Sequence, residues 1–180
     1  MGSEGGYARL ASSKQHLICV NPCRGRKPFQ QITTRNPLNS EEAQNLTLWP
    51  VHCVEGSHGA AFASELDVDK IDHVVRKGQD HRVEMFSAFR DAFKSPCVAV
   101  SDLASVLREK SIKGTYVVGL ARDFCVRETA LHSAAEGFKT TVLAEGTRGT
   151  DDSPAMLEQY RQELGRHKVQ YLTIAEANLA

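Results

Sequence analysis

The stretch Thr115-Tyr-Val-Val-Gly-Leu-Ala-Arg-Asp-Phe-Cys125 decides the fold and points to the chemistry of this chain. An apolar, β-branched run breaks at Gly119, and a cysteine then opens a segment with helical spacing of apolar residues. The first turn of a helix has backbone N–H groups without intrahelical partners and a partial positive charge, so it favours a thiolate over a thiol. Cys125 is therefore a candidate nucleophile. The alternative is a small residue that packs a helix against a sheet, the commoner role of a lone cysteine.

Outward from this stretch, apolar runs alternate with helical patterns from about residue 70 onward. Strands are predicted at 71–75, 116–119, 140–143 and 169–174, and helices at 85–93, from Ser101 or Asp102, at 125–137 and from Ser153-Pro154. The continuous apolar run at 116–119 is typical of a strand buried on both faces. The last helix is expected to face inward with Met156, Leu157, Tyr160 and Leu164. This alternation predicts an α/β fold with a parallel sheet and helices on both faces.

Composition sets the class of protein. The chain has 180 residues, of which 41% are hydrophobic, so it can bury one sizeable core. Lys+Arg and Asp+Glu both number 22, so we expect neither a nucleic acid nor a membrane partner. No apolar run approaches the roughly 20 residues that span a bilayer, and the N-terminus has no signal-peptide pattern. Five cysteines, an odd number without a secretory context, favour reduced thiols in the cytoplasm, with the nucleus or peroxisome as alternatives.

Several short motifs follow one another at the order and spacing of one enzyme family. They are Lys27-Pro-Phe29, Asn36-Pro-Leu-Asn39, Leu48-Trp-Pro-Val-His-Cys53, Gly59-Ala60, Arg76-Lys-Gly78, Phe86-Ser-Ala-Phe89, Tyr116-Val-Val-Gly-Leu-Ala121, Phe124-Cys-Val126 and Ala134-Ala-Glu-Gly-Phe-Lys-Thr-Thr-Val-Leu143. From Arg26 to about Val169 the chain resembles the fungal nicotinamidases of the isochorismatase-like cysteine hydrolases. The Leu-Trp-Pro-Val-His-Cys element points to nicotinamidases within that superfamily.

The resemblance implies roles for the residues around the thiol. Cys125 matches the family's nucleophile, and the backbone N–H groups of Cys125 and Ala121 match its oxyanion hole. The Leu120–Ala121 peptide matches a cis bond of the family. Lys77 matches the triad lysine, which holds a neighbouring carboxylate ionised; the alternative is a solvated lysine at a strand end.

The resemblance also implies a metal and an aromatic pocket. His52 matches a metal-binding histidine, and the implied divalent ion, zinc in the first instance, anchors the pyridine nitrogen of the substrate. Taken alone, His52 is more simply a hydrogen-bonded loop residue. Trp49 and Phe124 are expected to stack on the substrate ring or to form the pocket wall, with core packing as the alternative.

Two motifs of the family do not occur in this sequence. They are Asp-x-Gln-Asn-Asp-Phe, which carries the catalytic aspartate, and Asp-Trp-His-Pro, which carries metal ligands. We therefore expect residues 26–180 to form an isochorismatase-like hydrolase domain that lacks its first strands and helix, with an incomplete metal site. Little amidase activity and poor solubility are expected for the chain as it stands.

Residues 1–25 are expected to be irregular and unrelated to the family. Residues 2 to about 20 are interpreted as the family's metal-ligand segment read in another frame. Codons permitted for residues 10–20 spell Trp-His-Pro-Ala-Asn-Asn-Ile-Ser-Phe-Ala one nucleotide later.

Three functions remain compatible with these residues. The first is hydrolysis of nicotinamide to nicotinate and ammonia in NAD salvage, by a cysteine thioester mechanism. The second is another isochorismatase-like cysteine hydrolase with a carbamoyl or vinyl-ether substrate. The third is a non-catalytic remnant that binds a partner or a pyridine-like ligand. A small molecule is the expected binding partner, and assembly into a homo-oligomer is left open.

Overall fold

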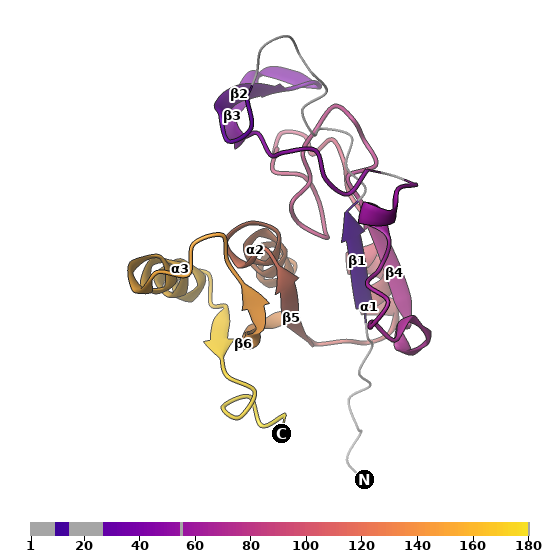
Figure 1. Cartoon of the computed structure of the whole chain (residues 1–180), viewed down its shortest axis with the longest axis vertical. Helices are drawn as coiled ribbons and strands as arrows, with labels where there is room; N and C mark the ends of the chain where they lie inside the picture. The colour runs from indigo at the N-terminus through magenta and orange to yellow at the C-terminus, as the bar shows by residue number, and fades with distance from the viewer. Residues whose placement is uncertain (1–9, 15–26, 55, 180) are drawn as a thin grey trace. The chain divides into compact units, whose positions relative to one another are not determined.

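The computed structural model describes residues 10–14, 27–54 and 56–179, which form two compact units (Figure 1). Unit 1 contains Phe86–Phe89 and the chain from Asp102 onward. Unit 2 contains the described residues up to Met85 together with Arg90–Ser101. Phe86–Phe89 is attached to unit 1 by a hydrogen bond of 3.0 Å from the Ala88 N–H to the hydroxyl of Thr129.

Unit 1 is built on a parallel three-stranded sheet in the order β5-β6-β7 (Figure 1, orange to yellow). The strands are β5 (Gly114–Leu120), β6 (Lys139–Arg148) and β7 (Gln170–Leu172). Its helices are α1 (Leu103–Glu109), α2 (Arg127–Ala135) and α3 (Pro154–Arg166), with a π-helical turn, η3 (Arg122–Val126), before α2. The predicted parallel α/β arrangement is confirmed in this unit.

The core of unit 1 lies between one face of this sheet and helices α2 and α3. Its buried residues are Val126, Ala130, Val142, Tyr160, Leu164 and Val169. On the other face of β5, Tyr116, Val118 and Leu120 are 45%, 54% and 73% exposed. The predictions that β5 is buried on both faces and that helices cover both faces of the sheet are therefore wrong for this part of unit 1.

Local signals place the helix ends of unit 1 well. Ser153 is the N-cap of α3, since its Oγ accepts the Met156 N–H at 3.5 Å, and a proline follows at the first helical position. Gly137 follows α2 with a φ of 91°, a left-handed conformation that glycine adopts without steric cost. Met156, expected to face inward, is instead 39% exposed. It lies in the first turn of α3, on the same helical face as Tyr160 and Leu164, but outside the buried core that those two residues join.

Unit 2 contains two small pairs of strands. β1 (Leu10–Lys14) pairs in parallel with β4 (His73–Lys77), and β2 (Gln31–Asn36) forms an antiparallel hairpin with β3 (Asn39–Thr47). Two 3₁₀ turns, η1 (His58–Ala60) and η2 (Val68–Lys70), lie between β3 and β4. Because β1 falls in the first 25 residues, the expectation that this range is irregular is wrong for Leu10–Lys14. The rest of the range lies outside the described residues, and the reading-frame interpretation stays a prediction.

The prediction of a helix at 85–93 is wrong, because polar side chains bind the backbone there. The Ser87 hydroxyl accepts the Phe89 N–H at 3.0 Å. Asp91 is fully buried, and its carboxylate accepts the N–H groups of Phe93 at 2.7 Å, Val98 at 2.7 Å and Ala99 at 2.5 Å. Such local bonds compete with the helical hydrogen-bond pattern and stabilise an irregular loop instead.

Glu42 fastens the β2–β3 hairpin to this loop within unit 2. Its carboxylate accepts the Asn36 Nδ2–H at 2.8 Å and the N–H groups of Lys94 at 2.8 Å and Ser95 at 3.1 Å. The hydrogen bond from Asn36, followed by that from the Lys94 N–H, lowers the pKa of Glu42. The amide of Asn36 also reaches the Pro96 carbonyl at 2.8 Å.

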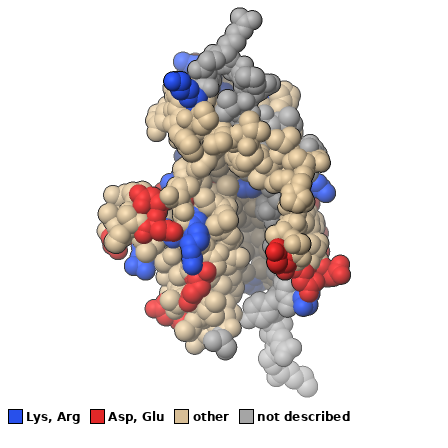
Figure 2. All heavy atoms as spheres, in the orientation of Figure 1, with Lys and Arg blue, Asp and Glu red and all other residues tan. Residues whose placement is uncertain are grey.

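Charges are mixed over the surface. Acidic and basic side chains are interspersed on the face shown in Figure 2, as the equal numbers of the two signs suggest. No helix in the described part of the chain is long and apolar enough to cross a membrane.

Candidate active site

Cys125 lies in the π-helical turn η3 of unit 1, between the end of β5 and the start of α2. It was expected to open the helix itself, and the structure instead places it two residues before α2. The carbonyl oxygen of Ala121 accepts the N–H groups of Phe124 and Val126, each at 3.1 Å. These two bonds fold the backbone tightly on either side of Cys125, whose side chain is half-buried.

The approach to this turn has unusual backbone geometry. Gly119 has a φ of 122°, which residues with a Cβ rarely adopt, and the parallel register of β5 with β6 shifts between Val117 and Gly119. The Leu120–Ala121 peptide is cis, as the family resemblance implies. Leu120 is exposed at the end of β5. The sequence therefore located this turn correctly, from the break in the apolar run.

The Phe124 ring packs against another aromatic ring of unit 1. Its half-buried ring lies 5.7 Å from the ring of Phe86, at an interplanar angle of 50°. Both rings belong to unit 1. This contact fits a packing role, and a role in stacking on a substrate ring stays a prediction.

Lys77 is the last residue of β4 in unit 2 and is only 5% exposed. The alternative interpretation as a solvated surface lysine is therefore wrong. A buried ammonium group is costly unless polar or charged groups compensate it, so burial at a strand end favours a functional lysine. Lys77 and Cys125 belong to different units, and their proximity stays a prediction.

His52 and Trp49 lie in unit 2, in the segment that follows β3. The Nδ1 of His52 is 2.7 Å from the Pro50 carbonyl oxygen, which fixes the orientation of the imidazole. The Trp49 ring contacts the rings of His52 and Phe29 edge-on, at centroid distances of 6.4 Å and 5.8 Å. Trp49 thus takes part in a small aromatic cluster, and its contact with a substrate stays a prediction.

The described residues do not fit a metal centre. Within residues 10–14, 27–54 and 56–179, no three His, Cys, Asp or Glu side chains lie close enough together to hold an ion. A single imidazole does not form a stable divalent site. We therefore derive no chemical step through a metal.

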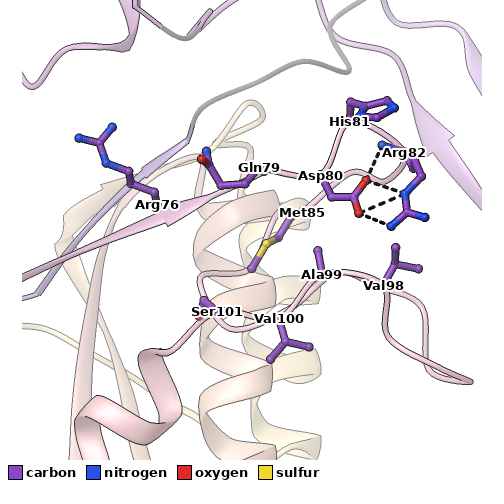
Figure 3. A pocket seen from close by; sticks show the side chains of 11 residues that line it. Arg76, Gln79, Asp80, His81, Arg82, Met85, Val98, Ala99, Val100 and Ser101 are labelled. Carbon is purple, nitrogen blue, oxygen red and sulfur yellow. Dashed lines mark hydrogen bonds and ion pairs between the residues drawn. The ribbon is translucent and has the colours of Figure 1, made fainter.

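Unit 2 also contains a cavity of about 690 Å³ (Figure 3). It is lined by Arg76, Gly78, Gln79, Asp80, His81, Arg82, Met85, Val98, Ala99, Val100 and Ser101. Arg82 forms an ion pair with Asp80 at 2.5 Å, and its hydrogen bonds to the Asp80 carboxylate lower the pKa of that group to about 2. The sequence analysis did not single out Asp80 and Arg82. Their position shortly after the Arg76-Lys-Gly78 motif was the available signal.

Sequence reasoning also missed two residues beside the candidate nucleophile. Arg122 is buried and forms an ion pair with Asp152 at 2.6 Å, while the Asp123 carboxylate accepts hydrogen bonds from Thr150. Both residues lie in η3, within three positions of Cys125. The charged pair Arg-Asp just before the thiol was the available signal.

Comparison with known proteins defines the class. The isochorismatase domain family matches residues 29–167 of the chain. The chain therefore belongs to the isochorismatase-like hydrolases, and its parallel sheet with flanking helices agrees with that fold.

Within this class the chain is similar to nicotinamidases. The nicotinamidase of Saccharomyces cerevisiae is 30% identical over 159 residues, which are 86% of this chain and 72% of the relative. The nicotinamidase of Schizosaccharomyces pombe is 38% identical over 104 residues, which are 58% of this chain and 45% of the relative. The crystal structure of the yeast nicotinamidase bound to the inhibitor nicotinaldehyde has a TM-score of 0.83 at 26% identity. That match covers 92% of this chain and 79% of the other.

Proposed function

We propose that this chain is a nicotinamidase-like amide hydrolase of NAD salvage, whose reaction converts nicotinamide and water to nicotinate and ammonia. One observation carries the proposal: Cys125 lies in the turn between β5 and α2, in a chain whose relatives are nicotinamidases. The cytoplasm, where thiols stay reduced, is the expected compartment.

The chemistry begins at the sulfur of Cys125. Its thiolate attacks the carboxamide carbon of nicotinamide, and a C–S bond forms while the C=O π electrons move to the oxygen. The backbone N–H groups of Cys125 and Ala121 are the proposed donors to this oxyanion. When the tetrahedral intermediate collapses, the C–N bond breaks and the nitrogen takes a proton and leaves as ammonia. Water then attacks the thioester carbon, breaks the C–S bond and releases nicotinate.

Lys77 supports this reaction through charge. As a buried cation it keeps a neighbouring carboxylate in its ionised form, and that carboxylate carries protons between the thiol, the leaving nitrogen and the water. The motif that holds this aspartate in the family is not found in the sequence. We therefore expect little turnover from the chain as it stands.

Two alternatives differ in what they predict. Another isochorismatase-like hydrolase would act on a carbamoyl or vinyl-ether substrate, against which the Leu48-Trp-Pro-Val-His-Cys53 element argues. A non-catalytic remnant would bind a pyridine-like ligand or a partner without releasing ammonia.

A reversible aldehyde tests the proposal without requiring turnover. A thiolate adds to an aldehyde to form a hemithioacetal, which resembles the tetrahedral intermediate of amide hydrolysis. We expect nicotinaldehyde to slow the alkylation of Cys125 by iodoacetamide, but not that of Cys53 or Cys97, and benzaldehyde to protect much less. Equal protection by both aldehydes, or none by either, would contradict a nicotinamide site.

Ammonia release then separates the enzyme from the binding protein. The chain and its Cys125→Ala variant are compared on nicotinamide, with and without zinc, beside carbamoyl and vinyl-ether compounds. Slow release from nicotinamide that is lost in the Cys125→Ala variant supports the hydrolase, at the low turnover expected of this chain. Protection by nicotinaldehyde without any release supports the non-catalytic alternative, and preferential cleavage of the other substrates supports the second hydrolase.

A further inference from the structure

The loop that follows β6 is fastened to the turn that carries Cys125. The carboxylate of Asp123 accepts the N–H of Thr150 at 3.0 Å and also its hydroxyl. Asp123 lies in η3 and Thr150 lies two residues beyond the end of β6, so this contact joins segments 27 positions apart in the sequence. Both segments belong to unit 1.

Arg122 makes a second fastening from the same turn. Its Nη2 is 2.6 Å from an Asp152 carboxylate oxygen and donates to the Asp151 carbonyl at 3.3 Å. Its guanidinium lies over the Tyr160 ring at 5.7 Å from the centroid, and the side chain is only 6% exposed. The buried Nε has no hydrogen-bond partner among the described residues, so the charge of Arg122 is compensated mainly through Nη2.

Gly149 provides the space in which this contact forms. A Cβ at position 149 would lie 2.8 Å from the Arg122 Nη2 and 3.2 Å from the Asp152 Oδ1. The N–H of Gly149 donates to that same carboxylate oxygen at 3.1 Å. This bond, and next the bond from Arg122, lower the pKa of Asp152, so the carboxylate is ionised at neutral pH.

We propose that Arg122 and Asp123 are positioning residues, which hold the Cys125 turn in its reactive geometry by binding Asp152 and Thr150 of the loop at 149–152. We call these two contacts the turn clamp. The proposal rests on the proposed function, because it assigns the clamp to the same nucleophile. Neither residue is proposed to contact the substrate. The clamp fixes the sulfur and the N–H groups of the turn, and a displacement of about 1 Å at such a site can cost about a hundredfold in rate.

A second arginine of unit 1 supplies a matched control. Arg108 pairs with Glu136 at 2.6 Å and lies over the Phe138 ring at 5.6 Å, distances close to those of Arg122. It differs in being 55% exposed and in lying on α1, outside the Cys125 turn. If the loss of any stacked, paired arginine loosened the Cys125 turn, Arg108→Gln and Arg122→Gln would have the same effect on it. The turn clamp predicts that only Arg122→Gln loosens the turn.

Hydrogen exchange tests the clamp itself, whatever the substrate. We expect Arg122→Gln and Asp152→Asn to speed amide exchange in 122–126 and 149–152 about tenfold each. The double variant should speed exchange by much less than the product of the two single effects, because both substitutions remove the Arg122–Asp152 ion pair. Arg108→Gln should leave these segments unchanged. Unchanged exchange in Asp152→Asn, or an equal effect of Arg108→Gln, would overturn the clamp.

Nicotinaldehyde protection of Cys125 tests the positioning role. Thr150→Val should weaken protection about tenfold, whereas Thr150→Ser, which keeps the hydroxyl, should retain it, with the unfolding midpoint unchanged in both. Equal protection in the two variants would overturn the role assigned to Asp123. Absence of protection in the unmutated chain would instead overturn the proposed function, and the exchange experiment would still decide the clamp. Because Thr150 is exposed, its variants remain informative if Arg122→Gln fails to fold.

Discussion

The two units of this molecule are ordered by different forces. In unit 1, apolar side chains of α2, α3 and the sheet form a continuous core around Val142 and Leu164, both without exposed surface. In unit 2, the loops are held by carboxylates that accept several backbone N–H groups, above all Asp91 and Glu42. Loss of a core side chain leaves a cavity, whereas loss of such a carboxylate leaves several backbone N–H groups without an acceptor at once.

The largest effect is expected in the core of unit 1. Leu164→Ala removes a fully buried side chain and leaves a cavity, so we expect it to lower the free energy of unfolding by about 4 kcal/mol. Urea unfolding followed by circular dichroism measures this change. As a control, Leu179→Ala removes a 41% exposed leucine and should cost much less. Equal losses in the two variants would show that the core described here does not stabilise unit 1.

Asp91→Ala should be the most damaging substitution in the loops of unit 2. It leaves three backbone N–H groups without their acceptor in a buried position, which should cost about 3 kcal/mol. Asp91→Asn keeps an amide oxygen as acceptor and should cost less. Amide exchange at 93–99 reports the loss directly. Amides that stay protected in the alanine variant would contradict the role of Asp91 in holding this loop.

A cluster of three hydroxyl groups in unit 1 tests the contrast between the apolar core of unit 1 and the polar loops of unit 2. The Ser133 hydroxyl lies 2.8 Å from the hydroxyls of both Thr115 and Thr140, joining α2 to β5 and β6. Ser133→Ala should lower the free energy of unfolding by about 1–2 kcal/mol, because it leaves the buried hydroxyl of Thr140 and the half-buried hydroxyl of Thr115 with fewer partners. Thermal unfolding measures the change. A loss as large as that of Leu164→Ala would mean that unit 1 also depends on polar contacts.

Acid should slightly weaken the hydrogen bonds by which Glu42 attaches the β2–β3 hairpin to the neighbouring loop of unit 2. The pKa of Glu42 is lowered from 4.5 in the folded state, so its stabilising effect is present above pH 4.5 and is lost as the pH falls through the lowered value. Amide exchange at Lys94 and Ser95, corrected for its intrinsic pH dependence, should speed up over that range. Glu42→Gln should show the faster exchange already at neutral pH. A pH dependence that is the same in wild type and Glu42→Gln would exclude this carboxylate as the cause.

The same contrast explains what the sequence could predict. The strand and helix order of unit 1 follows from apolar periodicity and from cap residues such as Ser153 and Gly137, because burial and local conformation determine those elements. The prediction of a helix at 85–93 was wrong. Aromatic spacing suggested an apolar helical face, but the side chains of Ser87 and Asp91 accept backbone N–H groups there. Periodicity does not detect such bonds.

The candidate site was predicted in part for the same reason. Cys125 and the cis Leu120–Ala121 peptide follow from a local break in the chain and from family motifs. Arg122 and Asp123 were missed because their partners, Asp152 and Thr150, are remote in sequence. Long-range polar contacts of this kind leave no periodic signal in a single sequence.

The reactivity of Cys125 is the most direct test of the central claim that this turn carries the nucleophile. Cys53, Cys97 and Cys125 are all free and half-buried, so exposure alone does not set their order of reaction. The native chain is treated with a limiting amount of iodoacetamide, and labelling at each site is quantified by mass spectrometry. We expect Cys125 to be alkylated first, and we expect unfolding in urea to abolish this difference in rate. Faster labelling of Cys53 or Cys97 in the native chain would contradict it.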